Sequence, residues 1–295
     1  MSALVCIGGA NLDLKFHFMS APHQGTSNPA RASFSPGGVA RNVAANLAAL
    51  GHAPKLVTIL GSDFAAEEIR TRSPGIDFSL SQRSASHPSG FYCAYISPEG
   101  ELLQAASAME GLEDLTPARL QDIDASTIFA DCNLRVDSLA FLAARPGSAL
   151  FIDPVSISKV EKLHAVLDRP ITALSPNRGE LAALFGVPVR TEADIAQACR
   201  ALHDRNVYHV MVGCGAEGAY FSARNGEGFF LPSQVSSCVD VTGCGDAAVA
   251  ALMHGLMAGW PFRRAAELAQ AAAAVTCASR ASVAENIGEL RHAAF

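Results

Sequence analysis

The residues best suited to chemistry lie in one short stretch, Asp240-Val241-Thr242-Gly243-Cys244-Gly245-Asp246, directly before an apolar helical run over residues 247–260. Its two glycines let the backbone turn tightly and approach a ligand closely. The helix that follows points free N–H groups and its positive dipole end at that turn, which makes an anion site. A carboxylate base beside an anion site is what phosphoryl transfer to a hydroxyl requires. The structural alternative is a glycine-rich turn with an ordinary capping aspartate at residue 246.

A second glycine cluster, Gly213-Cys214-Gly215-Ala216-Glu217-Gly218, fits the G-x-G-x-x-G pattern of dinucleotide-binding proteins. That fingerprint requires a helix to begin at the glycines and an acidic residue roughly 20 positions further on. Residues 219–222 are instead β-prone, and Ser233 stands at the expected acidic position. We therefore predict a strand–turn–strand against which a nucleotide could lie, and we disfavour a nicotinamide oxidoreductase. A plain hairpin turn fits this stretch equally well.

Polar residues also follow the first predicted strand and precede the first predicted helix. Asn11 and Asp13 come after a buried run, and Gly37-Gly38 leads into a helix that carries Asn42. Amide and carboxylate groups at the carboxyl ends of strands could hold sugar hydroxyls. Taken alone, Asn11 and Asp13 fit turn residues better.

The middle of the chain offers two further strand ends with polar groups. Asn177 and Glu180 are three residues apart, so both face one side of a first helical turn, where they could hold Mg²⁺ through water. An N-cap with its capping-box partner is the stronger local interpretation. After Asp153, Lys159 could reach a phosphate, although an exposed, solvated lysine is the more common use of such a residue.

Positioning these residues requires an α/β fold with a mostly parallel sheet. Buried β-prone runs at residues 4–7, 56–60, 127–130, 149–152 and 207–212 alternate with amphipathic stretches such as residues 39–50, which Gly51 ends. This alternation predicts a parallel sheet covered by helices on both faces.

Two stretches break this alternation and predict a small β lid over an active cleft. Residues 14–36 lack helical periodicity, and residues 86–105 contain a predicted hairpin around Pro98-Glu99-Gly100. The expected α/β core then comprises residues 1–13, 37–85 and 106–295, and the lid comprises residues 14–36 and 86–105.

The composition indicates a globular protein without a polynucleotide partner. The chain has 295 residues, 49% hydrophobic and 17% charged, with 22 Lys and Arg against 28 Asp and Glu and a net charge of −6. This balance excludes a disordered chain, and scattered basic residues disfavour nucleic acid binding. No apolar run reaches the ~20 residues of a membrane span. The start, Met1-Ser2-Ala3-Leu4, lacks the basic residues of a secretory signal, and the eight cysteines include no C-x-x-C pair, which predicts buried free thiols in a cytoplasmic protein.

In their order along the chain, these motifs resemble the ribokinase-like (PfkB) family of sugar and nucleoside kinases, over essentially the whole length. The resemblance implies a three-layer sandwich with a β lid, with ATP and Mg²⁺ as cofactors and a small-molecule alcohol as substrate. It further implies that Asp246 is the base and that Gly243, Cys244 and Gly245 form the anion hole. The sugar would be held by Asn11, Asp13, Gly38 and Asn42, and the nucleotide and Mg²⁺ would lie near Asn177, Glu180, Gly215, Gly218 and Thr242.

Several stretches resemble the pseudouridine-kinase branch of this family, above all Ser27-Asn28-Pro29 and Ala130-Asp131-Cys132-Asn133. The resemblance implies phosphorylation of the 5′-hydroxyl of pseudouridine, with Ser27 and Asn28 contacting the base. Asp240 resembles the monovalent-cation site of some relatives, which makes K⁺ a further candidate cofactor, and a homodimer through the lid is a candidate assembly.

The chain also departs from the pattern of this branch, and other functions stay open. Cys244 replaces the usual alanine, and Ser175 stands where this branch often carries lysine. Another nucleoside or pentose kinase, and a nucleoside-binding regulator without catalysis, therefore remain alternatives.

Overall fold

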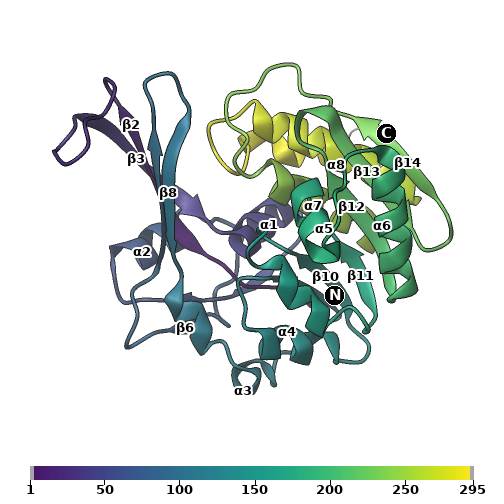
Figure 1. Ribbon diagram of the computed structural model, residues 1–295. Coiled ribbons are helices and arrows are strands. Elements are labelled where there is room, and N and C mark those ends of the chain that lie inside the picture. Colours follow the sequence, from purple (N-terminus) through teal and green to yellow (C-terminus); the bar gives the residue numbers. More distant parts are fainter. Residues whose placement is uncertain (1–2, 293–295) are drawn as a thin grey trace.

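The computed structural model describes residues 3–292, so the ends of the expected core, residues 1–2 and 293–295, lie outside the described residues. Its centre is an eight-stranded sheet in the order β14-β13-β12-β11-β10-β9-β1-β4 (Figure 1). Neighbouring strands from β4 to β12 run parallel, and β13 pairs antiparallel with both β12 and β14. The strands are β1 (Leu4–Ile7), β4 (Lys55–Val57), β9 (Thr127–Asp131), β10 (Ala149–Asp153), β11 (Ile171–Leu174), β12 (Val207–Gly213), β13 (Gly218–Ala223) and β14 (Gly228–Pro232).

Helices cover both faces of this sheet, which confirms the predicted three-layer α/β sandwich. Successive residues of a strand point to opposite faces, so Phe129 of β9 packs with one group of helices and Ile128 with the other. The first group is α1 (Val39–Ala49), α7 (Cys244–Met257) and α8 (Phe262–Cys277). The second is α3 (Pro117–Leu120), α4 (Val136–Ala143), α5 (Arg178–Phe185) and α6 (Glu192–Asp204). The short elements are α2 (Phe64–Thr71), β5 (Ile59–Leu60), β6 (Gln82–Arg83), and the 3₁₀ helices η1 (Glu110–Asp114), η2 (Val160–Ala165), η3 (Gly215–Glu217) and η4 (Glu285–His292).

A four-stranded sheet stands beside this body, at the left of Figure 1. Its order is β3 (Ala30–Gly37), β2 (Asn11–Phe18), β7 (Gly90–Ile96) and β8 (Leu102–Ala108). The strands extend past the expected lid ranges because β2 and β3 begin and end where the sheet joins the body, at the buried Asn11, Asp13 and Gly37. Leu102 and Leu103 are exposed on the edge strand β8. The predictions that this sheet acts as a lid and that it joins two copies of the chain both stay predictions.

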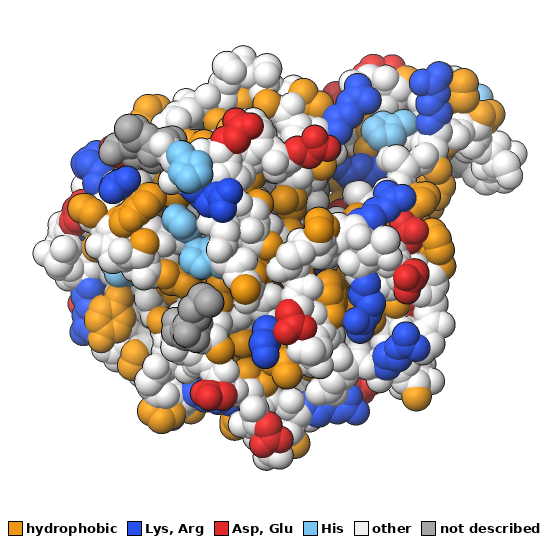
Figure 2. All heavy atoms as spheres, turned by 180° about the vertical axis from the view of Figure 1, so that it is seen from behind, with side chains coloured by type: hydrophobic (Ala, Val, Ile, Leu, Met, Phe, Trp, Pro, Cys, Tyr) orange, Lys and Arg blue, Asp and Glu red, His pale blue; other side chains and the backbone are white. Residues whose placement is uncertain are grey.

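The surface carries mixed charge, and most thiols are internal. Lys, Arg, Asp and Glu side chains are interspersed on the face shown in Figure 2. Within residues 3–292, no helix is both long and apolar enough to cross a membrane. All eight cysteines are free, as predicted, but Cys238 is exposed because it lies in an irregular segment between β14 and α7.

Candidate active site

Four of the predicted residues meet at the carboxyl edge of the central sheet. Asn11 and Asp13 start β2 just after β1, Asn42 lies in the first turns of α1, and Asp246 lies in the first turn of α7. The Asn42 Nδ2 atom donates to the Asp246 carboxylate at 2.7 Å, and the Asn11 amide donates to Asp13 at 2.5 Å. Gly38 lies against the backbone between them, because an added Cβ would come 2.5 Å from the Gly9 carbonyl oxygen.

Asp246 has the electrostatic properties of a general base. Burial raises its pKa to about 7, and the carboxylates of Asp131 and Asp13 act in the same direction. The hydrogen bond from Asn42 and the charge of Arg41 partly oppose this shift. A carboxyl group that titrates near neutral pH can accept a proton from an alcohol and later release it.

Arg41 fixes the orientation of Asn42, a role that the sequence did not reveal. Its guanidinium donates to the Asn42 amide oxygen at 3.0 Å, so the Asn42 amide nitrogen is left to face Asp246. The same guanidinium is held by the Pro36 carbonyl and the Ser73 hydroxyl. Because these three contacts are buried, Arg41 keeps the amide in one orientation before any ligand binds.

The predicted glycine turn forms as expected at the start of α7. Gly243 is the N-cap residue with φ +83°, a left-handed conformation that favours glycine, and an added Cβ would overlap the Ser282 carbonyl. The Cys244 amide makes only a long contact of 3.3 Å to the Val241 carbonyl. The first N–H groups of a helix have no intrahelical acceptor, so this turn can receive an anion.

We expect Cys244→Ala to leave both kcat and KM within about threefold of wild type. Burial raises the pKa of the Cys244 thiol to about 12, so the thiol is neutral and a poor nucleophile at neutral pH. Its side chain points toward the Asp240 carbonyl, at 3.9 Å, and the anion site uses the backbone. Steady-state kinetics on the purified variant test this, and a loss of tenfold or more would give the thiol a direct role.

Asp131 connects three segments of the site through hydrogen bonds. No role was assigned to it from the sequence. It is fully buried at the end of β9, where one oxygen accepts from the Gly9 amide at 2.8 Å and the Ala40 amide at 3.0 Å. Its other oxygen accepts from the Asn133 amide at 3.0 Å. One carboxylate therefore fixes the end of β1 and the start of α1 relative to β9.

Asn177 and Glu180 form a capping box at the start of α5. The Asn177 side chain accepts from the Glu180 amide at 2.9 Å, and Glu180 accepts from the Asn177 amide at 2.8 Å. Both side chains thus serve the helix end, which is the structural alternative that the sequence favoured.

Glu180 also belongs to a group of carboxylates with Asp153 and Asp246, which are at least partly buried. Burial raises the pKa of Asp153 well above its usual range, and Asp246 and Glu180 raise it further. Mutual repulsion of this kind favours a cation close by. Among the described residues, no three metal-ligating side chains converge on one point, so a Mg²⁺ ion here would be held mainly through water and phosphate oxygens.

The Gly213–Gly218 stretch forms the predicted strand–turn–strand. β12 and β13 are antiparallel, and Gly215 and Gly218 in the turn have φ of +60° and +126°. The Gly213 amide donates to the Pro176 carbonyl at 2.9 Å, which places this turn beside Asn177.

A cavity of about 710 Å³ lies between the segment after β14 and the end of α8. Gln234 and Ser236 line one side, and Ala274, Ala278 and Ala281 line the other. No function was assigned to these residues from the sequence, because a cavity depends on residues that meet only in the fold.

One residue lies differently from the sequence expectation, and two others lie where the lid was expected. Lys159 is half-buried and donates to the Asn133 side chain at 2.5 Å, so the expectation of a solvated lysine is wrong. Ser27 and Asn28 lie in the β2–β3 loop at the free end of the four-stranded sheet (Figure 1). The Asn28 amide bonds within that loop, to His23 and Thr26. A contact of Ser27 and Asn28 with the nucleobase of the substrate stays a prediction.

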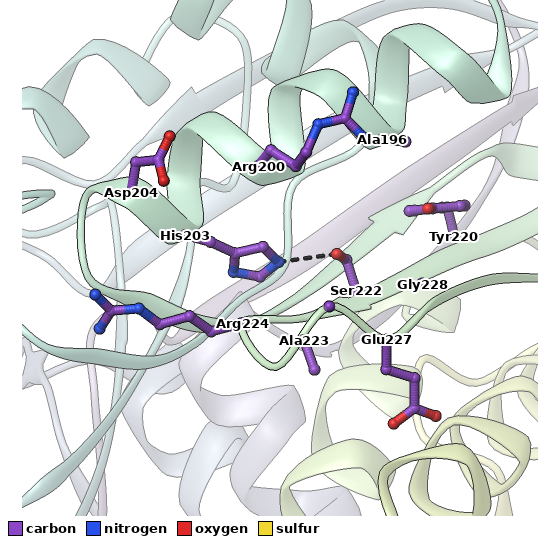
Figure 3. Close-up of a pocket in the computed structure, with 11 residues that line it drawn as sticks. Ala196, Arg200, His203, Asp204, Tyr220, Ser222, Ala223, Arg224, Glu227 and Gly228 are labelled. Atoms are coloured by element: carbon purple, nitrogen blue, oxygen red, sulfur yellow. Dashed lines mark hydrogen bonds between the residues drawn. The ribbon is translucent and has the colours of Figure 1, made fainter.

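A further cavity of about 370 Å³ lies between α6 and the β13–β14 hairpin (Figure 3). Its buried His203 is satisfied by the Val207 carbonyl and the Ser222 hydroxyl, each at 2.8 Å. It shares no lining residue with the group around Asp246, so it is separate from the candidate active site.

A mostly parallel sheet, a carboxylate behind a glycine turn, and polar side chains at the strand ends are the features that a small-molecule phosphotransferase needs. Residues 1–286 match the model of the pfkB family of carbohydrate kinases. The chain belongs to this family and is a sugar or nucleoside kinase.

Individual relatives agree with this family. A pseudouridine kinase of Escherichia coli K12 is 30% identical over 275 residues, covering 90% of this chain and 88% of the relative. An uncharacterised sugar kinase of the same organism, YeiI, is 32% identical, covering 93% and 78%. The structure of Arabidopsis thaliana ribokinase complexed with ribose and ATP superposes with a TM-score of 0.85 over 99% of each chain at 21% identity, which confirms the fold.

Proposed function

We propose that this kinase transfers the γ-phosphoryl group of ATP to the 5′-hydroxyl of pseudouridine. The reaction type is inferred from the position and the pKa of Asp246. Its pKa of about 7 and its hydrogen bond from Asn42 fit a general base beside the glycine turn. The similarity to a pseudouridine kinase of E. coli supports the substrate. The cytoplasm stays the expected location.

In this mechanism, ionised Asp246 accepts the proton of the substrate hydroxyl as the hydroxyl oxygen attacks the γ-phosphorus of ATP. The bond from that phosphorus to the bridging oxygen breaks, and ADP leaves. The amides of Gly243, Cys244 and Gly245 and the α7 dipole stabilise negative charge on the transferred group. Asn11, Asp13, Gly38 and Asn42 hold the ribose. Burial raises the pKa of Asp13, while Asn11, Lys15 and Arg41 favour its charged form, the better acceptor for sugar hydroxyls.

The nucleotide is proposed to lie along the turn at Gly215 and Gly218, with its base in the cavity beside α8 and its phosphates near Asn177 and Thr242. Glu180 and Asn177 would hold Mg²⁺ through water, with Asp153 close by. When bound, Mg²⁺ supplies positive charge to the phosphate oxygens.

A substrate panel tests this function directly. We expect ADP formation from ATP and Mg²⁺ to depend on pseudouridine, with uridine, ribose and adenosine as poor substitutes. Rapid turnover of ribose without turnover of pseudouridine would overturn the substrate assignment, but the protein would still be a kinase. Nucleoside binding without ADP release under any condition would identify a regulator instead.

A further inference from the structure

A lysine on the four-stranded sheet reaches the loop that builds the glycine turn. Lys15 lies on β2, two residues beyond Asp13 and on the same side of the strand. Its Nζ atom is 2.5 Å from Asp240 Oδ2 and 3.2 Å from the Thr242 hydroxyl. The Lys15 side chain is only 15% exposed and that of Asp240 is 27% exposed, so the ion pair is partly shielded from water.

The two carboxylate oxygens of Asp240 have different partners. Asp240 Oδ1 accepts from the Thr242 amide at 2.8 Å and from the Thr242 hydroxyl at 2.6 Å, which shapes the loop. Asp240 Oδ2 accepts from Lys15, which lies on β2 of the four-stranded sheet. The residue after Thr242 is Gly243, the N-cap of α7, so Lys15 holds the loop directly before the glycine turn.

Lys15 also balances charge in an acidic region. Although burial acts in the opposite direction, the hydrogen bonds from Lys15 and Thr242 hold the pKa of Asp240 below its usual value, so Asp240 is ionised. Burial is the main cause that raises the pKa of Asp13, and the nearby charge of Asp240 acts in the same direction. Without a cation beside it, this carboxylate would oppose the arrival of a phosphate at the adjoining turn.

We propose that Lys15 is a positioning residue whose ammonium serves as a built-in counter-ion for Asp240 and holds the catalytic turn against the four-stranded sheet. This proposal rests on the kinase function proposed above. Lys15 acts through Asp240 and the turn and does not contact the substrate, so its loss lowers the rate of transfer more than substrate affinity.

A double-mutant cycle tests the coupling. We expect Lys15→Met and Asp240→Asn each to lower kcat by about tenfold to a hundredfold, with the KM for the nucleoside within about threefold. The double variant should lose little more than either single variant, because both remove the same interaction. Lys15→Arg, which keeps the charge, should retain more of kcat. Lys55→Met is the matched control, since Lys55 pairs with Asp77 only at 4.0 Å on the surface, and it should match wild type.

Chemical rescue separates a counter-ion from a merely structural residue. Turnover of Lys15→Met should rise with added ammonium, which can replace the lost Nζ, and not with tetramethylammonium, which has no N–H donor. An equal response to both salts, additive losses in the double variant, or a raised KM with unchanged kcat would each overturn the proposal.

Hydrogen exchange keeps the test independent of catalysis. In Lys15→Met, the amides of residues 238–243 should exchange faster than in wild type and in Lys55→Met, because the loop has lost its anchor. If the wild-type protein transfers no phosphoryl group to any substrate, the proposed kinase function is wrong. The exchange rates of residues 238–243 still decide whether Lys15 anchors the loop. Unchanged exchange in this segment would refute the proposal.

Discussion

Asp246→Asn should lower turnover by about a hundredfold to ten-thousandfold, the usual contribution of a positioned general base. Asparagine cannot accept the proton of the attacking hydroxyl, while the glycine turn and the helix dipole remain to bind the nucleotide. We therefore expect kcat for ADP formation to collapse and the nucleotide Kd from calorimetry to stay near that of wild type. Turnover equal to wild type would remove Asp246 from the mechanism.

The pH dependence of the same variant gives an independent check. Because the pKa of Asp246 is raised to about 7, the wild-type kcat/KM should rise with pH as this carboxyl ionises, and Asp246→Asn should lack that limb. Stability should change in the opposite sense. The folded state binds this proton more tightly than the unfolded state, so the free energy of unfolding falls as pH rises from about 4 to 7.

This linkage predicts a variant that is inactive and more stable. Above pH 7, Asp246→Asn should melt at a higher temperature than wild type, because it removes the cost of ionising a poorly solvated carboxyl. Asp137→Asn is the matched control: the pKa of Asp137 is lowered by its hydrogen bond to Arg135, so this change should not stabilise the chain. Calorimetric melts at pH 5 and pH 8 measure both, and a lower melting temperature for Asp246→Asn at pH 8 would contradict the expected linkage.

The sequence could predict those parts of the site that depend on local structure. The turn at Gly243 and the start of α7 follow from glycines beside a helical run, and the strand–turn–strand at Gly213–Gly218 follows from the β-prone residues after it. The capping box at Asn177 and Glu180 is likewise a matter of spacing. Each of these features is complete within about ten residues of chain, so its physical cause is visible in the sequence.

The groups that connect these parts could not be predicted in the same way. Asp131 accepts from amides 122 and 91 residues away, and Lys15 bonds to a residue 225 positions away. Nothing in the residues around Asp131 distinguishes a buried connector from an ordinary strand-end aspartate. Lys159 was expected to be solvated for the same reason, since its exposure depends on Asn133, which lies at the end of a different strand. Long-range polar contacts of this kind require the fold.

Gly243→Ala should reduce kcat by about a hundredfold or more, comparable with the loss of an anion-hole donor. Its φ of +83° disfavours any side chain, and the added Cβ would also overlap the Ser282 carbonyl, so the turn must shift. A shift there moves the amides of Cys244 and Gly245 together, whereas Asp246 and Asn42 keep their own hydrogen bond. We therefore expect a loss of rate with the base still in place, measured as kcat and as an unchanged pH limb near 7.

Gly147→Ala separates this loss from simple backbone strain. Gly147 has φ +79° in the loop between α4 and β10, and an added Cβ would meet no atom within 4 Å. It should cost about 1–3 kcal/mol of stability, the usual strain of such a conformation, with turnover unchanged. If Gly243→Ala behaved like Gly147→Ala, with a lower melting temperature and full turnover, the turn would have only a structural role. A catalytic role for the turn requires that only Gly243→Ala loses rate, because only there does the strained residue carry the amides that would face the phosphate.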